Sequence, residues 1–158
     1  MGVTERTVHA RWAGGLRSVV DAGGFEVVSD EPASVPGGTD TGPQPTELFL
    51  ASVASCFTTA MAYSASKRNI GLSGLRVDVT GHYNGPSFDA LRIDVHADAP
   101  EGAELDKLVE AAKRVCYVTR TLAQPPEMTY LVNPSDSDSG TDSGAAAAVP
   151  SAEESATG

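Results

Sequence analysis

The sequence has few basic residues. Its 158 residues contain 11 lysines and arginines against 21 aspartates and glutamates, which gives a formal net charge of −10 at pH 7. Nucleic-acid binding depends on clustered Lys and Arg that neutralise phosphates, so this composition argues against nucleic acid as a partner. Half of the net negative charge lies in the C-terminal segment, at Asp136, Asp138, Asp142, Glu153 and Glu154.

The N-terminus lacks the apolar segment of a signal peptide, and no stretch reaches the run of about 18 apolar residues that suggests a membrane span. We therefore expect a cytoplasmic protein without a membrane partner. Only two cysteines are present, Cys56 and Cys116, and a structural disulfide is not expected in a reducing compartment. They are either inert core residues or redox-active thiols.

The residues around the cysteines also lack the spacing of a zinc site. His9, His82 and His96 are isolated, so we expect no metal or other cofactor. The glycine-rich segment GGTDTGP (37–43) precedes a predicted helix, and helix N-termini do bind anions. It has neither the lysine of a phosphate-binding loop nor a preceding strand in the dinucleotide pattern, which argues against a nucleotide site.

The first part of the chain predicts a small β-meander. Short β-branched runs at residues 7–12, 18–21 and 25–28 are separated by glycine pairs, which are typical of hairpin turns. A loop rich in Pro and Gly follows at residues 32–45.

From Thr46 to about Lys67, small and apolar residues recur at spacings of three and four, which predicts a long helix. Because its remaining sides are also apolar, we expect this helix to be buried nearly all round. Cys56 lies on its small-residue face, whose other members are Leu48, Ala51, Ser52, Ser55, Thr59, Ala60 and Tyr63.

The second part of the chain contains two strands, a helix and a closing segment. Alternating runs at 75–83 and 91–99, joined by an Asn-Gly turn, predict a hairpin. Residues 101–116 have helical spacing, with Cys116 at or just past the end and Lys113-Arg114 placed to complement the helix dipole. We expect a short helix at 118–124 and a strand at 127–132.

Strands and helices occur in runs and do not alternate, which predicts an α+β fold. We expect one domain over residues 1–132. Residues 133–158 have little apolar content beyond alanine, so we expect a disordered acidic tail.

Three stretches of the sequence carry a family resemblance: PTELFLASVASCF (45–57), GLSGLRVDVTGHY (71–83) and LVEAAKRVCYVTRTL (108–122). They resemble the OsmC/Ohr family of thiol-dependent hydroperoxide reductases, and the likeness extends over residues 7–132. The resemblance implies an intertwined homodimer with antiparallel sheets around a central helix and an active site where the subunits meet. It also implies that Cys56 is the peroxidatic thiolate and Cys116 the resolving thiol. The substrates it implies are organic hydroperoxides, with hydrogen peroxide as a further one, and the reductant is a dithiol such as a lipoyl protein.

The resemblance further implies a carboxylate and an arginine beside the thiolate. The carboxylate position of the family, ten residues before the first cysteine, is Thr46 here, and Glu47 follows it. Glu47 is also explained by its place in the first turn of a helix. Arg17 and Arg120 are the candidate cations, although each is equally explained as an ordinary surface or ion-pair residue. Tyr117 replaces the proline usual after the second cysteine.

Two functions therefore remain open. The first is a cytosolic peroxidase that uses Cys56 and Cys116 in defence against oxidative stress. The second is a non-catalytic dimer of the same fold that binds a small hydrophobic or thiol-containing ligand, as the missing carboxylate at Thr46 suggests. Fast alkylation of Cys56 at neutral pH would favour the first.

Overall fold

The structure is a computed structural model and describes residues 5–133. The chain divides into two units, residues 1–124 and 125–158. Except for Asn133, the acidic tail expected at 133–158 lies outside the described residues.

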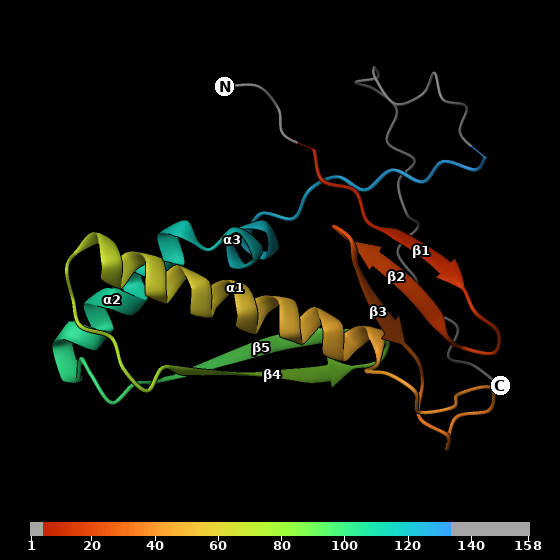
Figure 1. Ribbon diagram of the computed structural model, residues 1–158, viewed down its shortest axis with the longest axis horizontal. Helices are drawn as coiled ribbons and strands as arrows, with labels where there is room; N and C mark the ends of the chain where they lie inside the picture. The colour runs from red at the N-terminus through yellow and green to blue at the C-terminus, as the bar shows by residue number, and fades with distance from the viewer. Residues whose placement is uncertain (1–4, 134–158) are drawn as a thin grey trace, which may run out of the picture. The chain divides into compact units, whose positions relative to one another are not determined.

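The N-terminal strands form the expected meander (Figure 1). β1 (His9–Trp12), β2 (Ser18–Ala22) and β3 (Phe25–Ser29) pair antiparallel in the order β1-β2-β3. The turn between β1 and β2 requires glycine, because Gly15 has a φ of +56° and a Cβ there would collide with the carbonyl of Gly37. The prediction of a glycine-punctuated meander is confirmed.

A buried carboxylate organises the loop that follows β3. Asp30 is 0% exposed and accepts hydrogen bonds from the backbone N–H groups of Glu31 (2.8 Å), Thr39 (3.2 Å) and Thr41 (3.2 Å). The Thr41 hydroxyl adds a bond of 2.8 Å, and the Thr39 hydroxyl adds another. The bond from Thr39 is the main cause that holds the pKa of Asp30 well below its usual range. One side chain therefore fixes much of the loop before the long helix.

The long helix α1 (Pro45–Lys67) is confirmed, and so is the hairpin after it. β4 (Arg76–Asn84) and β5 (Ser87–His96) pair antiparallel, with Val77 opposite Val95 and Val79 opposite Ile93. β5 begins four residues earlier than predicted, because Gly85 has a φ of +61° and allows a two-residue turn.

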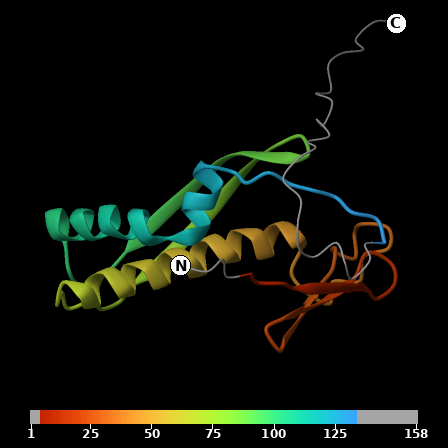
Figure 2. The same ribbon diagram turned by 90° about the horizontal axis from the view of Figure 1, so that it is seen from above.

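Two further helices pack against α1 (Figures 1 and 2). α2 (Gly102–Val115) runs beside the C-terminal half of α1, and α3 (Tyr117–Ala123) contacts α1 as well. Both helices were predicted. The buried cluster at this junction consists of Phe57, Ala60, Met61, Ala65, Leu108, Ala112 and Cys116.

The prediction that α1 is buried nearly all round is wrong for the single chain. Its contacts with β4, α2 and α3 cover one side, while Ala51, Ser52, Ser55, Thr59 and Tyr63 remain exposed. The expectation that no segment suits a membrane span was also too strict, because α1 is long and apolar enough by length and composition. The core helix of a folded domain meets the same criteria, and α1 contributes Phe57, Ala60, Met61 and Ala65 to the buried cluster.

The strand expected at 127–132 is not formed. Within the described part of this unit, residues 125–131 have no regular secondary structure, and Met128, Tyr130, Leu131 and Val132 are exposed. A strand needs a partner edge for its ladder of hydrogen bonds, and no pairing is found for this segment among the described residues.

Candidate active site

The two cysteines, sixty residues apart in sequence, lie side by side in the fold. Cys56 projects from the middle of α1, and Cys116 is the residue between α2 and α3. Their Sγ atoms are 3.4 Å apart. A disulfide needs about 2.05 Å between sulfurs, so a movement of about 1.3 Å would join them.

A short break between two helices positions Cys116. Its N–H donates to the Ala112 carbonyl (2.9 Å) and closes α2, while its own carbonyl accepts from the Arg120 N–H (3.2 Å) at the start of α3. At Cys116 the backbone is extended, with a ψ of 110°, and this turns the chain from one helix into the next. The side chain is 0% exposed within the core cluster.

The surroundings of Cys116 favour its thiolate. Burial alone raises the pKa of this thiol. Hydrogen bonds from the side chain and the backbone N–H of Thr119 act in the opposite direction, with smaller effects from Cys56 and the backbone of Val118. Together they lower the pKa of Cys116 below the ordinary thiol value, despite its burial.

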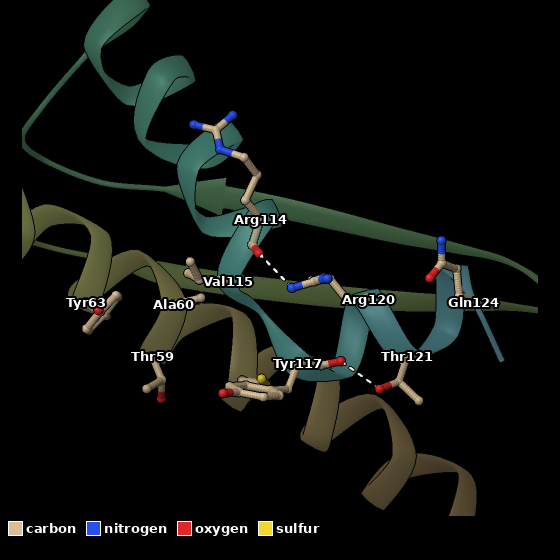
Figure 3. Close-up of a pocket in the computed structure, with 10 residues that line it drawn as sticks. Thr59, Ala60, Tyr63, Arg114, Val115, Tyr117, Arg120, Thr121 and Gln124 are labelled. Carbon is tan, nitrogen blue, oxygen red and sulfur yellow. Dashed lines mark hydrogen bonds between the residues drawn. The ribbon is translucent and has the colours of Figure 1, made fainter. Parts of the chain in front are cut away.

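Cys56 is half-buried and lines a cavity of about 810 Å³ (Figure 3). α1 supplies Thr59, Ala60 and Tyr63 to this cavity, and the end of α2 together with α3 supplies the opposite wall. The volume is in the range of small-molecule sites. The remaining lining residues are Arg114, Val115, Tyr117, Arg120, Thr121 and Gln124.

Of the predicted cations, Arg120 lines this cavity. Its Nη1 donates to the carbonyl of Arg114 (3.3 Å), which holds the guanidinium along the cavity wall (Figure 3). Arg17 does not line the cavity. Its Nη2 donates to the carbonyl of Ala13 (3.2 Å) within the β1–β2 hairpin.

Glu47 is also not brought to Cys56 within one chain. Its carboxylate accepts the N–H of Gln44 (2.8 Å) and caps the N-terminus of α1. Nine residues of helix separate it from Cys56, which corresponds to about 13.5 Å along the axis. In the single chain, Glu47 therefore has the capping role that its position in the first helical turn already explained.

Thr46, at the carboxylate position of the resemblance, has a structural partner. The Tyr83 hydroxyl lies 2.8 Å from the Thr46 hydroxyl and joins β4 to the first turn of α1. The Tyr83 ring also packs on Phe88 with 4.4 Å between centroids, and Phe88 stacks on Phe49.

Sequence reasoning did not assign Thr59, Tyr63, Arg114 or Gln124 to the site. Thr59 and Tyr63 stand three and seven residues after Cys56, a spacing that places them on the same helix face, so this signal was available. The role of Arg114 was obscured, because a basic residue at the end of a helix is already explained by the dipole. Within residues 5–133, no group of three His, Cys, Asp or Glu side chains could hold a metal ion.

Comparison with known proteins identifies the class to which this fold and cysteine pair belong. The family model for OsmC-like proteins matches residues 38–130, more than half of the chain, so the chain belongs to the OsmC-like family. None of the curated proteins matches it.

Solved structures agree with this assignment. An OsmC-like protein from Mycoplasma pneumoniae is 18% identical with a TM-score of 0.63, over 77% of this chain and 89% of its own. A proposed organic hydroperoxide resistance protein from Vibrio cholerae, with captopril in one of its active sites, is 27% identical with a TM-score of 0.55 (75% and 86% coverage). An organic hydroperoxide resistance protein from Elizabethkingia anophelis with bound thiocyanate is 24% identical with a TM-score of 0.54 (76% and 89%).

Proposed function

We propose that this protein is a cytoplasmic, thiol-dependent peroxidase that reduces organic hydroperoxides in defence against oxidative stress. The observation that supports it best is the 3.4 Å separation of the Cys56 and Cys116 sulfurs beside a cavity into which Cys56 opens. Three structural relatives carry the name organic hydroperoxide resistance protein, one of them as a proposed assignment. Hydrogen peroxide is a further, slower substrate.

In the proposed reaction, the Cys56 thiolate attacks one peroxide oxygen, and the O–O bond breaks to release an alcohol after protonation. Cys56 becomes a sulfenic acid. The sulfur of Cys116 then attacks the Cys56 sulfur and expels hydroxide, which leaves as water once protonated, and a disulfide remains. A dithiol such as a lipoyl group restores both thiols by exchange. Arg120 lines the same cavity as Cys56, and in this proposal it is the cation that stabilises the thiolate.

The proposal includes a homodimer. The exposed face of α1 carries small residues such as Ala51, Ser52 and Ser55, which allow another backbone to approach closely. Covering this face with a second copy would bury the helix on all sides, as its apolar composition predicts. Arg17 and Glu47, which do not line the Cys56 cavity of their own chain, are then available to the site of the other copy.

The test uses pure protein with an alkyl hydroperoxide and dihydrolipoamide. We expect turnover that is lost in Cys56→Ser, and a Cys56–Cys116 disulfide in the mass spectrum after one equivalent of hydroperoxide. Absence of turnover, or a Cys56→Ser variant as active as the parent, would reject the proposal.

A second function is favoured by the residue at position 46. Thr46 is bonded to Tyr83 and supplies no carboxylate, which suits a non-catalytic dimer whose cavity binds a small hydrophobic or thiol-containing ligand. The Vibrio cholerae relative holds captopril in one of its active sites. Saturable captopril binding by the Cys56→Ser variant, with slow alkylation of Cys56 in the parent, would favour this function.

A further inference from the structure

The two sulfurs differ in their access to solvent. Cys56 is half-buried and lines the 810 Å³ cavity, whereas Cys116 is 0% exposed and does not line it. Atoms of the same chain bury Cys116, so association with a second copy cannot uncover it. A disulfide between the two residues would therefore present one sulfur to an incoming thiol.

We propose, on the basis of the proposed function, that the reducing thiol attacks Cys56 and not Cys116. The reductant then enters through the same cavity as the hydroperoxide and forms a transient mixed disulfide on Cys56. Hydroperoxide and reductant use this entrance in turn.

The exchange is balanced in electrons and protons. The thiolate of the reductant forms a bond to the Cys56 sulfur, and the Cys56–Cys116 bond breaks with its electron pair on Cys116. The second thiol of the dithiol loses its proton and attacks the reductant sulfur in the mixed disulfide. Cys56 leaves as a thiolate, so the dithiol is oxidised to a disulfide while both cysteines are reduced.

The surroundings of Cys116 suit a leaving group. Thiol–disulfide exchange is faster when the departing thiol has a low pKa, and the pKa of Cys116 is lowered despite its burial. Thr119 has the largest lowering effect, and its hydroxyl lies 3.5 Å from the Cys116 carbonyl. Thr119 does not line the cavity of Cys56.

The experiment locates the mixed disulfide on the full chain. The cysteines are joined with diamide, which avoids any need for peroxidase activity, and the product is treated briefly with 2-mercaptoethanol and quenched in acid with N-ethylmaleimide. Peptide mass mapping should place mercaptoethanol on Cys56 and maleimide on Cys116, in about tenfold excess over the reverse pattern. The same protein unfolded in urea is the control and should give both patterns.

Equal or preferential addition to Cys116 in the folded protein would overturn the inference, and so would failure of diamide to join the cysteines. If the diamide-made disulfide gives the expected pattern but hydroperoxide forms no disulfide, the proposed function fails and this inference stands. If mercaptoethanol adds to Cys116 in a protein that does turn over hydroperoxide, this inference fails and the proposed function stands.

Discussion

The hydroxyl of Tyr83 lies 2.8 Å from the hydroxyl of Thr46, and this hydrogen bond joins the sheet to the N-terminus of the helix that carries Cys56. Thr46 occupies the position at which the family resemblance implies a carboxylate. The helix start is therefore attached to β4 by a neutral bond, supported by the stacked rings of Tyr83, Phe88 and Phe49.

Removing this bond should weaken the fold slightly. We expect Tyr83→Phe, which keeps the ring packing, to lower the free energy of unfolding by about 0.5–1 kcal/mol, because the pair is exposed to solvent. Thr46→Val should cost a similar amount, and the double variant should cost no more than either single one. Urea unfolding measures all three, and strictly additive losses would show that the two hydroxyls do not interact.

Loss of the buried thiol should change the fate of Cys56 under oxidation. In Cys116→Ser, the sulfenic acid on Cys56 has no thiol 3.4 Å away, so excess hydroperoxide should carry it on to sulfinic acid. Intact-mass spectrometry should show a gain of two oxygen atoms that the parent largely avoids. Cys56→Ser is the matched control and should gain neither oxygen. Equal over-oxidation of parent and Cys116→Ser would mean that Cys116 does not resolve Cys56.

The exposed face of α1 should govern association. Ser55→Arg places a large charge on the small-residue face and should convert the proposed dimer to monomer in light scattering. Asp106→Arg adds an arginine to the exposed side of α2 and should leave the mass unchanged. A dimer that survives Ser55→Arg with unaltered circular dichroism would place the interface elsewhere.

Asp30 should make stability depend on pH. Because its pKa is lowered on folding, its contribution is fully present above the ordinary carboxyl pKa of about 3.9 and is lost as the pH falls through the lower folded value. Asp30→Asn should lower the melting temperature by several degrees at pH 7, and the difference from the parent should narrow on acidification. Asp40→Asn, on the same loop but exposed, should have little effect at either pH. A difference independent of pH would show that the charge of Asp30 is not the cause.

Local sequence signals were sufficient for most of the elements. Glycine pairs marked the meander, and the change to helical spacing at Thr46 marked α1 to within one residue. The two wrong predictions, the burial of α1 and the strand at 127–132, depend on packing partners that a local sequence pattern does not contain. Apolar residues on every side of α1 do not reveal that one chain covers only one side, and an alternating segment such as 127–132 does not reveal whether an edge is available to it.

The sequence predicted the main residues of the site but not how they come together. Local motifs singled out Cys56 and Cys116, but their proximity depends on how α1 packs against α2 and α3, which no spacing encodes. The buried role of Asp30 was invisible, because its threonine partners stand nine and eleven residues further along a loop.

The Asp30 network has a consequence for how the chain is held together. The loop from the first sheet into α1 is held by the Asp30 carboxylate and its hydrogen-bond donors. The junction of α1 with α2 and α3 is held by apolar side chains. Acid should therefore loosen the loop that Asp30 holds while the apolar cluster around Cys56 and Cys116 stays packed. Cold or mild denaturant weakens apolar packing and should loosen that cluster first.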